Sequence, residues 1–266
     1  MKFIVSGAIA LLISLSVFAQ KADDDANVSL KEVKREFSFV TGNNEFPVNI
    51  KEESNYSYFC NSYSTEITVA EFYNDMESID AVEIIIDGYK KHRIVPTYEY
   101  YESEGIFYSD ARVCHFKLPI PRQGTISNVK MRKTIRDPKY FTSIHFMEPY
   151  PIADQEVVIR VPVWMNIELK EFNFEKYKIK KTVTSEGDIT VHRFTMKNLP
   201  ALKRQSSSPG FTYYSPHIMV LCKSAEPKQG RQTYFNTLKD QYNWYRQLLL
   251  AIGNDRRPVA QEMTVE

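Results

Sequence analysis

The sequence predicts an all-β fold, a large antiparallel β-sandwich followed by one amphipathic α-helix at the C-terminal end. Aromatic residues, which pack well on pleated surfaces, are abundant, with 17 Tyr and 16 Phe against 9 Gly. Short strand-like runs alternate with turn residues, without intervening helices long enough to connect parallel strands. Only the C-terminal part repeats apolar residues at helical spacing. Residues 31–230 fit either one sandwich or two stacked sandwiches.

The N-terminus has the pattern of a signal peptide. Lys2 precedes an apolar stretch from Phe3 to Phe18, and compact residues stand at the −3 and −1 positions of a cleavage site after Ala19. We therefore predict a signal peptide over 1–19, a flexible mature N-terminus over 20–30, and a periplasmic or secreted protein. No later segment is apolar enough to span a bilayer, so no membrane span is expected after cleavage.

The charges of the chain are balanced. It has 34 Lys and Arg against 33 Asp and Glu, and the predicted leader removes Lys2 alone. Nucleic-acid binding needs a surplus of basic side chains on one face, so we expect no nucleic-acid partner.

In the first half of the chain we expect short strands in residues 33–41, 46–53 and 55–73. The stretch 81–103 should form two strands separated by a break at Asp87-Gly88. These short strands suit antiparallel sheets.

The second half has clearer patterns. In residues 155–169, alternate positions are apolar, which predicts one half-buried strand with Pro162 at an edge or bulge; these positions are Val157, Ile159, Val161, Val163, Ile167 and Leu169. Residues 176–199 predict a hairpin with its turn at Ser185–Asp188, and 216–224 a further buried strand.

Residues 231–253 predict the C-terminal helix, which ends at Gly253-Asn254 before a flexible tail over 254–266. Its apolar stripe is formed by Phe235, Leu238, Tyr242, Tyr245, Leu249 and Ile252. The stripe must cover the sandwich itself or another chain. Phe235, Leu238, Tyr242, Trp244 and Leu249 are therefore the candidate partner-binding residues.

Cys114 and His115 stand side by side, which raises the question of a catalytic pair. On a strand, neighbouring side chains point to opposite faces, so we expect Cys114 in the core and His115 toward solvent. One disulfide with a thiol left over is permitted, but the odd count favours three buried free cysteines, Cys60, Cys114 and Cys222. The five histidines lack zinc-site spacing, and no phosphate loop occurs, so no metal or cofactor is predicted.

Several packing and turn motifs resemble a known family. They are Phe107–Asp110 (FYSD), Lys117-Leu118-Pro119 with Gly124, Lys133–Asp137 (KTIRD), Tyr140-Phe141, Pro151–Glu156 (PIADQE), Val161–Trp164 (VPVW), Asn198–Leu202 (NLPAL) and the helix around Trp244. With them, residues 31–252 resemble the β-sandwich domain of unknown function that precedes transglutaminase-like cores in secreted proteins of Gram-negative bacteria. In that family the core that follows supplies a catalytic Cys, His and Asp. No such motif occurs in this sequence, so the resemblance assigns no catalytic residue to it.

The sequence therefore predicts an exported, non-catalytic module that binds or positions a protein or peptidic partner, with a transglutaminase-like or protease-like domain as the expected partner. Two alternatives stay open. One is a Cys-dependent transglutaminase- or protease-like enzyme, with Cys114 or Cys222 as the nucleophile. The other is a carbohydrate-binding module that uses surface aromatic residues, namely Tyr98, Tyr100, Tyr101, Trp164 and Trp244.

Overall fold

The computed structural model describes residues 27–91, 93–101, 110–203 and 209–253, with side chains as far as Leu250. The predicted signal peptide, the tail over 254–266 and most of the predicted flexible N-terminus lie outside these residues. So do Phe107–Ser109 and the side chain of Ile252. The first strand begins at Val28, so the predicted flexible segment 20–30 extends too far by three residues.

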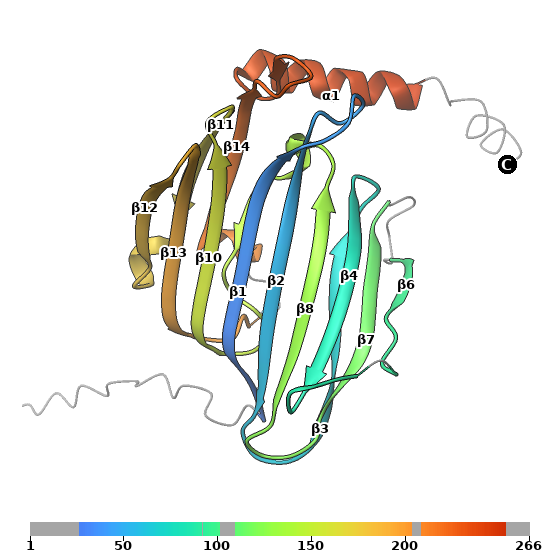
Figure 1. Ribbon diagram of the computed structural model, residues 1–266, viewed down its shortest axis with the longest axis vertical. Helices are drawn as coiled ribbons and strands as arrows, with labels where there is room; N and C mark the ends of the chain where they lie inside the picture. Colours follow the sequence, from blue (N-terminus) through green and yellow to red (C-terminus); the bar gives the residue numbers. More distant parts are fainter. Residues whose placement is uncertain (1–26, 92, 102–109, 204–208, 254–266) are drawn as a thin grey trace, which may run out of the picture.

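Eight strands form the main sheet, in the spatial order β12-β13-β10-β1-β2-β8-β4-β5 (Figure 1). All neighbours are antiparallel except β1 and β10, which run parallel. The strands are β1 (Val28–Thr41), β2 (Val48–Cys60), β4 (Glu77–Ile86), β5 (Tyr89–Lys90), β8 (Ile126–Ile135), β10 (Ile152–Pro162), β12 (Lys180–Glu186) and β13 (Ile189–Leu199).

Two smaller antiparallel sheets complete the sandwich. One has the order β3-β7-β6, and the other has the order β11-β14-β15, with β9 also paired to β14. Their strands are β3 (Thr65–Tyr73), β6 (Thr97–Tyr100), β7 (Arg112–Ile120), β9 (Ser143–His145), β11 (Met165–Phe172), β14 (His217–Ala225) and β15 (Gln232–Thr233). Three short 3-10 turns, η1 (Pro138–Tyr140), η2 (Phe174–Lys176) and η3 (Phe211–Tyr213), lie in the connections.

A single hydrophobic core joins the three sheets. Phe37 of the main sheet, Leu118 of β7 and Ile218 of β14 are all fully buried and belong to the same cluster. The predicted all-β fold with antiparallel sheets and one C-terminal helix is therefore confirmed, and the structure has one sandwich, in which one layer is divided between two sheets.

Strand β1 shows how the sequence assigns its two faces. Val33, Phe37 and Phe39 are buried, and the residues between them include Lys34 and Glu36, which lie on the outer face. This alternation is the period of two that a half-buried strand requires. The outer face of the main sheet is consequently polar.

The prediction of one strand over residues 155–169 is wrong. The chain leaves the main sheet after Pro162, turns at Val163 and Trp164, and enters the other layer as β11. Val163 is 73% exposed, although its parity had placed it in the core. A period of two cannot distinguish one long strand from two strands of equal parity joined by a two-residue turn.

The predicted hairpin is confirmed, with β12 and β13 joined at Gly187. Gly187 has a φ of 59°, which is the left-handed conformation that glycine adopts without strain. Val183, which the alternation would have placed toward the core, is 52% exposed because β12 is an edge strand.

The C-terminal helix, α1 (Leu238–Gly253), begins seven residues later than predicted, because β15 occupies part of the intervening segment. Thr237 caps its first turn: its backbone N–H donates to Asp240 Oδ2 at 2.7 Å, and its hydroxyl accepts from the Asp240 N–H at 3.3 Å. Within the described residues, no helix has the length and apolarity needed to cross a membrane.

Candidate functional site

The apolar stripe of α1 is exposed. Leu238 is 85%, Tyr242 68%, Tyr245 51% and Leu249 69% exposed. We call these four residues the helix stripe. The stripe therefore does not cover the sandwich, and its large apolar side chains face solvent. The helix that carries them lies at one end of the molecule (Figure 1).

Trp244 attaches the helix to the sandwich. Its ring packs edge-on against Tyr140, with 5.7 Å between ring centroids, and it also contacts Phe235 at 5.3 Å. The five candidate partner-binding residues consequently divide into two groups. Phe235 and Trp244 hold the helix in place, whereas Leu238, Tyr242 and Leu249 remain accessible to another molecule.

The structure separates Cys114 from His115 as the strand pattern predicted. Cys114 is buried, while His115 Nε2 lies 2.9 Å from Glu99 Oε1 on the opposite face of β7. All three cysteines are buried and free, as the odd count favoured. Burial raises the pKa values of the Cys114 and Cys222 thiols above the ordinary value, so their reactive thiolate forms are disfavoured.

The three tyrosines proposed as sugar contacts lie on or beside β6 and are 44–64% exposed. Arg112 stacks over the ring of Tyr100 at 4.9 Å, and Phe72 packs edge-on against Tyr101 at 4.9 Å. Burial, together with the neighbouring Cys114, raises the pKa of Tyr98 to about 12. These contacts are those of cross-strand packing.

Four rings form a row across the smaller sheet that contains β14. Phe172 stacks on His217 at 5.0 Å, His217 lies 5.3 Å from His145, and His145 lies 4.8 Å from Phe211. Burial, His217 and Arg35 lower the pKa of His145 to about 4, so this ring is neutral at neutral pH. The row borders a small hollow of about 290 Å³ beside the start of α1. Because β9 and β14 are far apart in the chain, the sequence pattern could not bring the two histidines together.

A buried charge network links the main sheet to both smaller sheets. Arg35 donates to Glu52 Oε1 through Nε (2.9 Å) and Nη2 (2.8 Å), and through Nη1 to the His145 carbonyl (3.2 Å). Lys133 Nζ lies 2.7 Å from Glu71 Oε1 and 3.6 Å from Glu52 Oε2. The network therefore connects β1, β2 and β8 to β3 and β9. The positive charges of Arg35 and Lys133 equal in number the negative charges of Glu52 and Glu71.

These side chains keep their charges despite burial. Burial opposes ionisation of Glu52, but Arg35 and Lys133 outweigh it and lower its pKa. Burial likewise opposes the charges of Arg35 and Lys133, yet the neighbouring carboxylates raise both pKa values. Glu148 differs, since burial raises its pKa to about 7 against the attraction of Arg35. Burial therefore suppresses the ionisation of Glu148, and it likewise raises the pKa of Glu77, which lies near Lys133.

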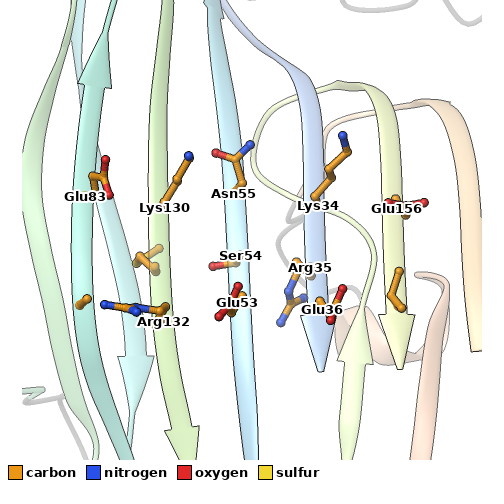
Figure 2. Close-up of a pocket in the computed structure, with 13 residues that line it drawn as sticks. Lys34, Arg35, Glu36, Glu53, Ser54, Asn55, Glu83, Lys130, Arg132 and Glu156 are labelled. Atoms are coloured by element: carbon orange, nitrogen blue, oxygen red, sulfur yellow. The ribbon is translucent and has the colours of Figure 1, made fainter. Parts of the chain in front are cut away.

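A second, larger hollow lies on the outer face of the main sheet and has a volume of about 550 Å³. Figure 2 shows its side chains in two rows that cross the strands. The register aligns the first row, which consists of Glu83, Lys130, Asn55, Lys34 and Glu156. The second row consists of Ala81, Arg132, Glu53, Glu36 and Val158. We call this site the polar hollow.

The polar hollow has no signature in the sequence pattern. Each of its residues is an ordinary polar residue on the solvent side of a strand, and charged residues in such positions are usually solvated. Only the register of five strands brings them together. The alternating polar positions of β1, β2 and β8 were the available signal, but they did not reveal which strands are neighbours.

Comparisons with solved structures support the fold. The chain is similar to a provisionally assigned protease from Parabacteroides distasonis, with a TM-score of 0.54 and 14% identity, over 74% of this chain and 41% of that one. At this identity the similarity shows the fold alone. The chain thus spans well under half the length of that protein.

Weaker similarities extend to proteins of other kinds. A provisionally assigned nutrient-binding protein from Legionella pneumophila matches with a TM-score of 0.37 and 6% identity, over 73% of this chain and 67% of that one. An M1 zinc metallopeptidase from Deinococcus radiodurans matches with a TM-score of 0.38 and 8% identity, over 75% and 44% of the two chains. Scores this low carry no functional argument.

No curated protein sequence matches the chain. The family described as a domain of unknown function with solved structure, DUF3857, matches residues 69–203. This range runs from within β3 to just beyond β13, and contains Glu71 and Lys133 of the buried network but not Arg35 and Glu52. Because the match includes just over half of the sequence, the chain belongs to the DUF3857 family.

Proposed function

We propose that this protein is an exported, non-catalytic accessory module whose helix stripe binds a transglutaminase-like or protease-like domain. The observation that carries the proposal is the exposure of Leu238, Tyr242, Tyr245 and Leu249 on one face of α1. Burying a large apolar side chain contributes roughly 1.5–3 kcal/mol, and this free energy is not gained within the chain. A contiguous apolar surface of this kind is typical of a protein interaction site.

The polar side of α1 favours a protein partner over a membrane surface. Helices that lie in a membrane interface usually carry many basic residues on their polar side. In the described part of α1, the basic residues are Lys239 and Arg246, accompanied by the acidic Asp240. The leader-like pattern at residues 1–19 supports export, where such a module would meet other exported domains.

The chemistry of the partner is suggested by the similar protein from Parabacteroides distasonis. This chain covers 41% of that provisionally assigned protease, so more than half of that protein lies outside the shared fold. A sandwich of this type can thus accompany a protease-like region. The resemblance to sandwiches that precede transglutaminase-like cores favours the same class of partner.

The proposal is tested by calorimetry with the transglutaminase-like protein of the same genome as the partner. The unmodified chain should bind it, and a variant with Leu238→Ser, Tyr242→Ser and Leu249→Ser should bind at least about tenfold more weakly, because it lacks the apolar surface. A variant with Val163→Ser and Val183→Ser is the matched control, since both valines are exposed and lie outside α1. Absence of binding, or equal weakening in both variants, would contradict the proposal.

A further inference from the structure

We infer that the polar hollow of the main sheet is a second binding site, which takes an extended acidic peptide lying along β8. The inference is independent of the helix stripe. It rests on three observations: which charges in the hollow lack partners, how far apart they lie, and which ligands the surrounding carboxylates exclude.

Most charges at the margin of the hollow are already paired. Lys34 lies 2.9 Å from Glu32, Glu36 lies 2.7 Å from Arg160, Glu83 lies 2.8 Å from Lys90, and Glu156 pairs with Arg193. Because each of these marginal charges already has an ion-pair partner, it is less available to a ligand.

The centre of the hollow is different. Lys130, Arg132 and Glu53 are exposed, and within the described part of the chain none of them has an ion-pair partner. Oδ1 of Asn55, between Lys34 and Lys130 in the first row, is shielded from solvent and has no hydrogen-bond partner among the described residues. A buried carbonyl without a donor is unfavourable, and a ligand N–H would satisfy it.

The spacing of the two free cations matches an extended chain. Lys130 and Arg132 are alternate residues of β8 on one face, so their Cα atoms are about 7 Å apart. Side chains at alternate positions of an extended peptide have the same spacing. Two carboxylates in such a peptide can therefore meet Lys130 and Arg132 together, while a backbone N–H donates to Asn55.

The carboxylates of the hollow argue against a polyanion. The carboxylate of Glu53, which has no ion-pair partner among the described residues, would repel the continuous phosphates of a nucleic acid. The unpaired Glu53, opposite Arg132 in the register, can accept from N–H groups of the same peptide.

Fluorescence anisotropy with three labelled, end-blocked peptides tests the inference. Thr-Glu-Thr-Glu-Thr should bind, Thr-Gln-Thr-Gln-Thr should not, and Thr-Glu-Glu-Thr-Thr, whose carboxylates point to opposite sides, should bind more weakly. The variant with Lys130→Gln and Arg132→Gln should bind the first peptide roughly tenfold more weakly. The variant with Lys176→Gln and Lys178→Gln removes the same charge elsewhere on the surface and should bind normally. The helix-stripe variant should also bind normally, which separates this site from the proposed partner surface.

Three results would overturn the inference. One is equal loss of binding in the two charge variants. Another is equal affinity for both glutamate peptides, because the spacing would then play no part. The third is tighter binding of a single-stranded oligonucleotide than of the peptide, which would indicate general attraction of polyanions. Both charge variants alter exposed side chains, so circular dichroism should show an unchanged fold.

Discussion

At the scale of single residues, Glu52 and its neighbour Glu53 illustrate how one strand assigns opposite roles. Glu52 points into the sandwich between Arg35 and Lys133, whereas Glu53 points outward into the polar hollow. The same residue type is thus structural at one position and available for binding at the next.

The two glutamates provide a matched pair of stability measurements. Glu52→Gln leaves two buried cations without their shared carboxylate and should lower the free energy of unfolding by about 3–5 kcal/mol. Glu53→Gln alters an exposed side chain and should change it by less than about 0.5 kcal/mol. Urea denaturation of both variants checks this expectation. Similar stability of the two would show that the buried network does not hold the sheets together.

Glu148 should make stability depend on pH. Its folded pKa of about 7 lies above the ordinary value of 4.5, so the folded protein holds this proton more tightly than the unfolded chain does. The resulting stabilisation is fully present below pH 4.5 and is lost as the pH rises through about 7.

The Glu148→Gln variant isolates this effect. Its melting temperature relative to the unmodified protein should increase between pH 4.5 and pH 8, because glutamine cannot ionise. Burial lowers the pKa values of His145 and His192, so these two histidines make the stability rise with pH. Both proteins contain them, so their contributions cancel in the difference between the two melting temperatures. A difference in melting temperature that is constant with pH would refute the assignment.

At the scale of elements, the helix shows what periodicity can and cannot predict. The three- and four-residue steps correctly predicted a helix ending at Gly253, because an apolar stripe and a glycine stop are local signals. They could not show that the stripe would face solvent. That outcome depends on Trp244, which is off the stripe and packs against Tyr140, a residue about one hundred positions away.

Two truncations test how the helix is attached. Removing residues 238–266 leaves β15 and the buried Tyr234 in place, so the sandwich should stay folded and lose only about 1–3 kcal/mol through the contacts of Trp244. Removing residues 231–266 also deletes β15 and Tyr234, and should cause aggregation or a large fall in the melting temperature. The melting temperatures of the two truncated chains, compared with that of the full chain, test both expectations. Unfolding of the shorter deletion would mean that the helix is part of the core.

The alternation of apolar and polar residues in the strands also predicted local features but not contacts between distant strands. Alternation predicted the faces of β1 and the separation of Cys114 from His115, since both depend only on the pleat. It missed the crossing between layers at Val163, and it could not reveal the parallel pairing of β1 with β10. Both features depend on contacts between strands distant in the sequence.

At the scale of the whole molecule, one sandwich carries both of the surfaces proposed for binding. Its single core joins three sheets, and the buried charge network ties the divided layer to the main sheet. The proposed partner surface lies on α1 at one end, and the polar hollow lies on the outer face of the main sheet (Figures 1 and 2). The hollow could not be predicted from the sequence, because its two rows exist only once five strands are in register.

The central claim is that α1 carries the surface used by a protein partner. Hydrogen–deuterium exchange of the chain, with and without the transglutaminase-like protein of the same genome, tests it most directly. We expect slower exchange in residues 238–253 when the partner is added, and unchanged exchange in β3, β7 and the hairpin of β12 and β13. Protection of those strands with no change in the helix would contradict the claim.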